Sequence, residues 1–209
     1  MHSQLSKAQK EAVMHKDGPM MVLAGPGSGK TLVITKRIQY LISHYQIPPQ
    51  RILVITFTRA AANEMKERAE KMLKEKCGIT ACTYHSFCVK MLRFYGKMAG
   101  ISPDFTIISG PDEADIIDII KSELNFQKLK NMPSASVFAS MLSTCVNKRL
   151  TLEELLKEQK YWRFRQNERK LLLLREETKK YKEEHNLFNY DDILLKFDQM
   201  LTDYSNIAR

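Results

Sequence analysis

The sequence predicts an α/β fold, with a parallel sheet in the first half of the chain and an all-helical subdomain inserted after it. Two observations lead to this prediction. Short apolar runs alternate with amphipathic segments up to about residue 110, which is the pattern of parallel strands connected by helices. From about Pro111 onward, segments with helical spacing follow one another with few strand signals.

In the first half, each element is predicted from its apolar spacing. Residues 20–23 form a short apolar strand candidate before a glycine-rich turn, and residues 51–57 and 79–82 contain further apolar runs typical of buried parallel strands. Helices are expected between and after them, because apolar residues recur at helical spacing or strong helix formers dominate. These helices span residues 31–44, 60–76 and 86–99.

In the second half, four helices are expected, at residues 112–124, 134–147, 152–156 and 161–184. The last of these is densely charged around a run of four leucines at 171–174. Such a pattern is typical of a solvated helix with one apolar face. Neither half contains an internal repeat or a low-complexity linker.

Composition narrows the class of protein. The chain is 44% hydrophobic and 27% charged, as in globular proteins that are soluble in water. No apolar run approaches 18 residues, so we expect no membrane-spanning helix. We expect a cytoplasmic protein with reduced thiols, because the N-terminus lacks the pattern of a signal peptide and the chain has only four cysteines.

The net charge of +9 lies entirely in the first half of the chain. Residues 1–110 contain 16 Lys and Arg against seven Asp and Glu, whereas residues 111–209 contain 17 of each kind. A basic excess favours a polyanionic partner such as nucleic acid, since binding releases counterions. Many basic proteins have no such partner, so charge alone leaves the question open.

The strongest motif is a phosphate-binding loop between the first expected strand and the first expected helix. It resembles the Walker A pattern, with Ala24 where the strict pattern has its first glycine. Glycines let backbone N–H groups converge on a phosphate, and the helix that follows adds its N-terminal partial charge. Lys30 is expected to reach the β- and γ-phosphates and Thr31 to bind Mg²⁺, which makes them the candidate catalytic residues. The loop consists of Ala24, Gly25, Pro26, Gly27, Ser28, Gly29, Lys30 and Thr31.

Four further stretches narrow the class of phosphate-loop protein, because the loop alone occurs in kinases, GTPases, transporters and helicases. The stretches read LSKAQKEAV from residue 5, TFTRAAANEMKER from residue 56, TYHSFC from residue 83 and FNYDDIL from residue 188. Together with the loop they resemble the UvrD/Rep/PcrA-like superfamily 1 DNA helicases. The resemblance is strong over residues 5–88 and weaker in the second half.

The resemblance implies a role for Gln9, 21 residues before Lys30. In the family this glutamine reads the edge of adenine, and an amide can donate to and accept from that edge at once. The alternative is an ordinary helix capped by Ser6. Leu32 stands where some relatives have an arginine near the adenine, so we do not expect base stacking from that position.

The resemblance also implies a path for single-stranded DNA along two helix starts. Thr58 and nearby amides would cap a helix and hold a phosphate, and Phe57 would stack on a base. Taken alone, Phe57 would be interpreted as a core aromatic and His85 as a structural histidine. The implied DNA contacts are Thr56, Phe57, Thr58, Arg59, Thr83, Tyr84, His85 and Ser86.

For the whole chain, the resemblance implies the opening part of a helicase. Residues 1–110 would be an incomplete RecA-like subdomain 1A, residues 111–190 a helical insertion 1B, and residues 191–209 a return segment. The rest of 1A and subdomains 2A and 2B are not in this sequence. The parent would be an ATP- and Mg²⁺-dependent DNA repair or recombination helicase, translocating on single-stranded DNA and acting at single-strand–duplex junctions. No Walker B acid is recognisable, so we expect the fragment alone to be inactive.

Two other patterns are rejected as active centres. Residues 112–115 read DEAD, but Ser109, Gly110 and Pro111 separate these acids from the preceding apolar run, as at a helix N-terminus. No zinc pattern matches the spacing of Cys77, Cys82, His85 and Cys88. We predict instead that Cys82 and Cys88 are buried thiols. Three rival functions stay open: an AddA/RecB-type helicase–nuclease, a stand-alone ATP- or DNA-binding module and, least favoured, a small-molecule kinase.

Overall fold

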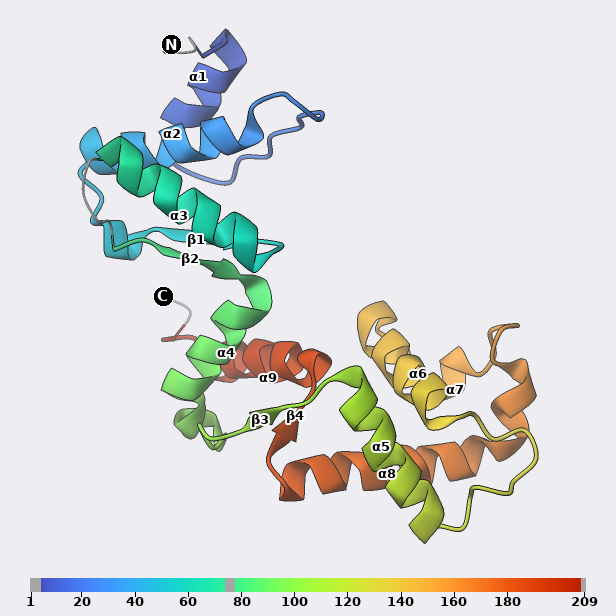
Figure 1. Ribbon diagram of the computed structural model, residues 1–209. Helices are drawn as coiled ribbons and strands as arrows, with labels where there is room; N and C mark the ends of the chain where they lie inside the picture. The colour runs from blue at the N-terminus through green and yellow to red at the C-terminus, as the bar shows by residue number, and fades with distance from the viewer. Residues whose placement is uncertain (1–4, 74–77, 208–209) are drawn as a thin grey trace. The chain divides into compact units, whose positions relative to one another are not determined.

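The computed structural model describes residues 5–73 and 78–207, which form two compact units (Figure 1). The first, here called the α/β unit, ends at Phe87, and the second, the helical unit, begins at Cys88. The boundary lies within helix α4 (Tyr84–Tyr95). Each unit has a hydrophobic core of its own.

The α/β unit has the expected alternation of helices and parallel strands. Strands β1 and β2 pair in parallel, with Leu53 opposite Thr80 and Thr56 opposite Thr83. The strands predicted at 51–57 and 79–82 and the helices predicted at 31–44 and 60–76 are confirmed, although residues 74–76 lie outside the described residues. Its elements are α1 (Lys7–Met14), α2 (Lys30–Ser43), η1 (Pro49–Arg51), β1 (Leu53–Thr56), α3 (Arg59–Leu73) and β2 (Thr80–Thr83).

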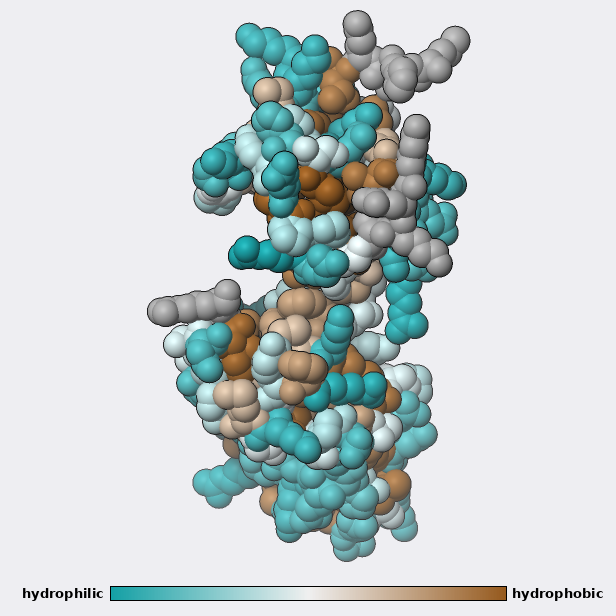
Figure 2. Space-filling view, turned by 90° about the vertical axis from the view of Figure 1, so that its left-hand side faces the viewer, coloured by the Kyte–Doolittle hydropathy of each residue, from teal (hydrophilic) through white to brown (hydrophobic). Residues whose placement is uncertain are grey.

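The core of the α/β unit covers one face of this sheet. Val54 of β1 is buried with Ile38 of α2 and Ala69 of α3. Its neighbours Leu53 and Ile55 project from the opposite face, since side chains alternate along a strand, and both are exposed. Apolar residues accordingly reach the surface of this unit, and the face drawn in Figure 2 shows apolar patches among hydrophilic residues in both units.

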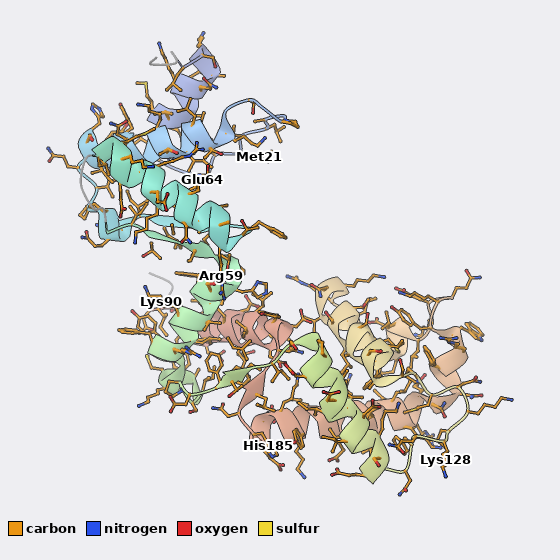
Figure 3. All side chains as sticks on the ribbon, viewed as in Figure 1. Met21, Arg59, Glu64, Lys90, Lys128 and His185 are labelled. Atoms are coloured by element: carbon orange, nitrogen blue, oxygen red, sulfur yellow. The ribbon has the colours of Figure 1, made fainter. Side chains whose placement is uncertain are left out.

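The strand predicted at residues 20–23 is wrong. This segment has no regular secondary structure and pairs with no strand among the described residues. Leu23 is 87% exposed and Met21, labelled in Figure 3, is 82% exposed. An apolar run becomes a strand only when a neighbouring strand accepts its hydrogen bonds. Neither β1 nor β2 does so, and the segment instead leads into the phosphate loop as an exposed connection.

The helical unit consists of helices packed around one large core. The predicted helices at 112–124, 134–147 and 152–156 are confirmed. The helix predicted at 86–99 begins at Tyr84 and ends at Tyr95, where a 3-10 turn takes over. The elements are α4, η2 (Gly96–Ala99), β3 (Thr106–Ile107), α5 (Gly110–Glu123), α6 (Ala135–Lys148), α7 (Leu152–Leu155), η3 (Trp162–Asn167), α8 (Glu168–Glu184), β4 (Leu187–Phe188) and α9 (Tyr190–Asp203).

Two features of this unit differ from the prediction. The segment 161–184 is not one helix, because a 3-10 turn precedes α8 and buries Tyr161 and Phe164 at a spacing of three residues. In addition, the unit is not wholly helical. Strands β3 and β4, about 80 residues apart in the chain, form a two-residue parallel pair.

The core of the helical unit lies where α5, α6 and α8 meet. Ile117 of α5, Phe138 of α6 and Leu171 of α8 have no exposed surface. This closed packing contrasts with the one-sided sheet of the α/β unit. Among the helices of the described ranges, none is long and apolar enough to cross a lipid bilayer.

Candidate functional site

The phosphate loop leads directly into the N-terminus of α2. Gly27 and Gly29 have φ angles of 73° and 80°, in the left-handed region that glycine adopts most easily. The Ser28 hydroxyl donates to the Gly25 carbonyl oxygen at 2.7 Å and tightens the turn. Gly29 is the N-cap residue, so no side chain satisfies the first N–H groups of α2.

Lys30 and Thr31 form the first helical positions of α2. The Lys30 ammonium lies over the loop, where it donates to the carbonyl oxygens of Gly25 at 2.8 Å and Ala24 at 3.2 Å. The Thr31 carbonyl accepts the Thr35 hydroxyl at 2.6 Å, a bond within the first turns of α2. The residues predicted to bind phosphate and Mg²⁺ are therefore together at one helix start.

Gln9 joins this loop from helix α1. Its Oε1 accepts the Ser6 N–H at 2.8 Å in a capping box, which confirms Ser6 as the helix cap. Its Nε2 donates to the Ser28 carbonyl at 3.0 Å. One amide hydrogen and one oxygen lone pair remain for a ligand, because a glutamine amide has two of each. Capping and ligand recognition are thus compatible at this residue.

The residues of the first predicted DNA contact follow β1. Thr58 caps α3, since its hydroxyl accepts the Ala61 N–H at 3.1 Å, as expected for this motif. Thr56 donates to the Thr58 carbonyl at 2.8 Å and stabilises the turn between strand and helix. Phe57 is 99% exposed, so the interpretation as a core aromatic is wrong. Arg59 begins α3 and is also exposed (Figure 3).

The residues of the second predicted contact follow β2. Thr83 caps the start of α4, because its Oγ1 accepts the Ser86 N–H at 3.3 Å while it donates to the Ser86 hydroxyl at 2.8 Å. Tyr84 is about half exposed and His85 is partly buried. Thr56 and Thr83 are partners in the β1–β2 register, so the two predicted contacts lie beside each other at one sheet edge.

The DEAD sequence lies at the start of α5, which confirms its interpretation as a helix N-terminus. Asp112 accepts hydrogen bonds from the hydroxyl and the backbone N–H of Ser109, and these bonds lower the pKa of its carboxyl below the usual range. Glu113 is buried in an ion pair with Lys182. Of the thiols, Cys88 is buried as predicted, Cys82 is partly exposed, and Cys77 lies outside the described residues.

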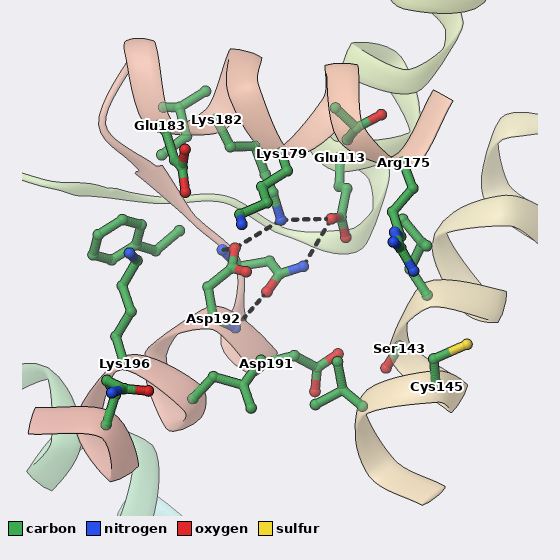
Figure 4. Close-up of a pocket in the computed structure, with 18 of the residues that line it drawn as sticks. Glu113, Ser143, Cys145, Arg175, Lys179, Lys182, Glu183, Asp191, Asp192 and Lys196 are labelled. Atoms are coloured by element: carbon green, nitrogen blue, oxygen red, sulfur yellow. Dashed lines mark hydrogen bonds and ion pairs between the residues drawn. The ribbon is translucent and has the colours of Figure 1, made fainter. Parts of the chain in front are cut away.

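A buried charge cluster in the helical unit was not predicted from the sequence. The Lys182 ammonium of α8 lies 3.0 Å from Glu113 of α5 and 2.7 Å from Asp192 of α9, and the Asn189 amide donates to Glu113 at 2.8 Å (Figure 4). Burial acts to lower the pKa of Lys182, but Asp192 and Glu113 outweigh it, and the pKa is raised. The cluster lines a cavity of about 580 Å³ that no predicted site residue reaches.

Comparison with known proteins agrees with these motifs. The model of the family described as "UvrD/REP helicase N-terminal domain" matches residues 5–209. The chain belongs to this family. The ATP-dependent DNA helicase PcrA of Staphylococcus epidermidis RP62A is 40% identical to it over 156 residues, and that of Staphylococcus aureus Mu50 is 38% identical over 156 residues. Each match covers 74% of this chain and 21% of the relative, so the chain spans about a fifth of the length of these helicases.

This UvrD/REP helicase domain has a basic surface on the helical unit. Residues 126–133 and 159–170 contain seven Lys and Arg against one Glu. Gln166 and Asn167 hold the two segments together by donating to the Lys130 carbonyl at 3.0 and 2.9 Å. Trp162 is 60% exposed, and the Arg165 guanidinium lies 5.4 Å from its ring centre. Cations interleaved with aromatic rings are typical of surfaces that bind nucleic acid.

Proposed function

We propose that this chain is the ATP-binding part of an ATP-dependent DNA helicase that translocates on single-stranded DNA. The observation that carries the proposal is the phosphate loop, whose lysine, glycines and uncapped α2 N-terminus meet at one point. Membership in the UvrD/REP family supports the choice of helicase among the phosphate-loop proteins. The names of the PcrA relatives support ATP dependence and DNA as the substrate.

The residues of the loop fit a nucleotide triphosphate. A Cβ atom added at Gly25 or Gly27 would meet nothing within 4 Å, so an anion has room beside the backbone. The free N–H groups of α2 would hold its phosphates. Lys30 would exchange its two carbonyl partners for phosphate oxygens, the Thr31 hydroxyl would hold Mg²⁺, and Gln9 would use its remaining donor and acceptor on the adenine edge.

The proposed DNA path runs along the edge where β1 and β2 end. Phe57 offers an exposed ring for stacking, and Arg59 offers a cation near the start of α3. The remaining residues of this edge are hydroxyl, phenol and imidazole groups suited to phosphates and sugars. They are Thr56, Thr58, Thr83, Tyr84, His85 and Ser86.

For the form of the DNA, we infer a single-strand–duplex junction. The support is that each unit has a surface suited to nucleic acid, the α/β unit at its sheet edge and the helical unit at its basic surface. We retain residues 1–110 as the incomplete RecA-like subdomain 1A, residues 111–190 as the insertion 1B and residues 191–209 as a return segment. A cytoplasmic location is part of the same proposal.

Titration calorimetry with Mg²⁺-ATP tests the proposal. We expect saturable binding by the wild-type chain and a loss of at least about tenfold in affinity for Lys30→Ala, since a charge-assisted phosphate contact is removed. Lys36→Ala is the matched control, because Lys36 lies on the same helix and its ammonium donates to Gln39, a residue outside the phosphate loop. Equal affinities for wild type and Lys30→Ala would contradict the proposal.

A further inference from the structure

Helix α1 is a short helix that is fastened to its surroundings at three places. It has eight residues, too few for a stable isolated helix. Its buried residues Ala12 and Val13 pack against Val33 of α2. Its first turn is tied to the phosphate loop by Gln9, and its last turn is tied to α2 by Arg37. The position of Gln9 at the loop therefore depends on what holds the rest of the helix.

Arg37 holds the C-terminal end of α1. Its Nη1 donates to the carbonyl oxygens of His15 at 2.6 Å, Ala12 at 3.1 Å and Val13 at 3.4 Å. Carbonyls in the last turn of a helix lack partners within the helix, and a cation there also interacts favourably with the helix dipole. The Tyr45 hydroxyl adds one bond, to the Met14 carbonyl at 3.3 Å. Arg37 thus supplies most of the bonds that anchor this end.

The opposite end of α1 fits the loop closely. A Cβ atom added at Gly29 would lie 3.2 Å from the Gln9 Nε2, so the amide sits directly against the residue that caps α2. The bonds from Gln9 to Ser28 and from Ser6 to Gln9 fix this amide between helix and loop. A small shift of α1 along its axis would break the Gln9–Ser28 bond, because its length of 3.0 Å leaves little slack.

We propose that Arg37 is a positioning residue for nucleotide recognition, which acts through α1 by holding Gln9 against the phosphate loop. The inference rests on the proposed function, in which Gln9 reads the base and Lys30 binds the phosphates. The Nη1 group of Arg37 donates to carbonyls at the end of α1, and the role that we propose needs no contact between Arg37 and the nucleotide. It sets recognition of the base and leaves the hold on the phosphates to Lys30.

The test compares Arg37→Met with Arg37→Lys and with the control Lys36→Met, which changes the neighbouring side chain of α2. Affinities for Mg²⁺-ATP, Mg²⁺-GTP and Mg²⁺-tripolyphosphate are measured by calorimetry. For Arg37→Met we expect ATP affinity to fall about tenfold and the preference for ATP over GTP to be lost, while tripolyphosphate affinity changes less than about twofold. Arg37→Lys, which keeps a cation at the helix end, restores part of the preference.

Two outcomes of the titrations would overturn the role of Arg37. One is an equal loss of affinity for ATP and tripolyphosphate, which would mark Arg37 as important only for general stability. The other is an unchanged preference for ATP over GTP in Arg37→Met.

A measurement without ligand separates this inference from the proposed function. In NMR spectra of the ¹⁵N-labelled chain, Arg37→Met is expected to shift the Gln9 side-chain amide signals and the backbone amides of Ser28 and Gly29, and Lys36→Met is not. Gln9→Met identifies the side-chain signals by removing them. Unshifted signals in Arg37→Met would overturn the role of Arg37. A wild-type chain that binds no nucleotide would overturn the proposed function, and the NMR comparison would still decide the coupling.

Discussion

The two units of this chain are held together in different ways. The largest fully buried side chains all belong to the helical unit, among them Phe138, Leu171 and Met200. The α/β unit buries its residues on one side of a two-stranded sheet and leaves Met21, Leu23 and Phe57 exposed. Every residue predicted to bind ATP or DNA nevertheless lies in the α/β unit.

This difference between the units indicates that the predicted ATP and DNA residues are positioned by hydrogen bonds rather than by a surrounding hydrophobic core. Gln9 and Ser28 hold the nucleotide loop and Arg37 holds α1 through a few hydrogen bonds. Thr58 and Thr83 place the strand ends through helix caps. Each such bond contributes about 1 kcal/mol, whereas one buried leucine contributes several times as much. Substitutions should therefore separate stability in one unit from binding in the other.

The largest effect is expected for Leu171→Ala in the core of the helical unit. Removing this fully buried side chain from α8 leaves a cavity, and we expect the unfolding free energy of the unit to fall by about 4 kcal/mol. Urea unfolding followed by the fluorescence of Trp162, the only tryptophan, measures it. Leu173→Ala is the matched control on the same helix, because Leu173 is 43% exposed and should cost less than about 1 kcal/mol. Similar losses for both would contradict a core confined to one face of α8.

A slightly smaller loss is expected for Lys182→Met. The substitution leaves Glu113 and Asp192 without their shared cation, so we expect the helical unit to lose about 3 kcal/mol at neutral pH. The folded pKa of Lys182 is raised above the ordinary lysine value of 10.5. Its contribution is therefore complete below pH 10.5 and is lost as pH rises through the folded value.

The pH dependence of this contribution is measured by unfolding wild type and Lys182→Met between pH 7 and 12. The difference between their unfolding free energies should become smaller only above pH 10.5. Lys180→Met is the control, because Lys180 is exposed on the same helix and its ion pair with the exposed Glu184 is long, at 3.8 Å. A difference that is constant across this range would show that the cluster is not the source of the stability.

Much of the fold follows from local sequence, because apolar spacing and helix caps are local. The helices from residue 110 to 155 and the two strands of the parallel sheet, β1 and β2, were predicted within a few residues. The structure of residues 20–23 was predicted wrongly, since apolar composition cannot show whether a neighbouring strand exists to pair with this segment. The β3–β4 pair was missed for a related reason, as two residues give no alternation.

For the functional residues too, those that belong to a local motif were predicted from the sequence, whereas those defined by their three-dimensional surroundings were not. The phosphate loop and the strand-end residues were predicted from their motifs, and they lie at the expected helix starts. The strand expected before the phosphate loop is the exception, since residues 20–23 form none. The buried position of Lys182 was not predicted, because the sequence around it is typical of a solvated, charged helix face. Its partners Glu113 and Asp192 are about 70 and 10 residues away in the chain. The pattern of Asn189 and Asp192, a helix capping box, was the only local signal of that cluster.

An effect on binding without an effect on stability is expected for Phe57→Ala. The side chain is 99% exposed, so its loss should leave the melting temperature unchanged, whereas affinity for a single-stranded oligonucleotide should fall about tenfold. Fluorescence anisotropy at fixed salt measures the affinity. Phe94→Ala is the matched control, an exposed phenylalanine of the helical unit at 77%, and is expected to bind as wild type. Equal losses in both variants would argue against a stacking role for Phe57.

A similarly small effect on stability is expected for the paired substitution Met21→Ser and Leu23→Ser in the exposed segment before the phosphate loop. Because neither side chain is buried, the unfolding free energy should stay within about 0.5 kcal/mol of wild type. Exposed apolar residues favour association, so sedimentation velocity should show the wild-type chain self-associating at concentrations where the variant is monomeric. A variant that loses several kcal/mol would show that residues 20–23 are buried in a paired strand, and the α/β unit would then have a closed core like that of the helical unit.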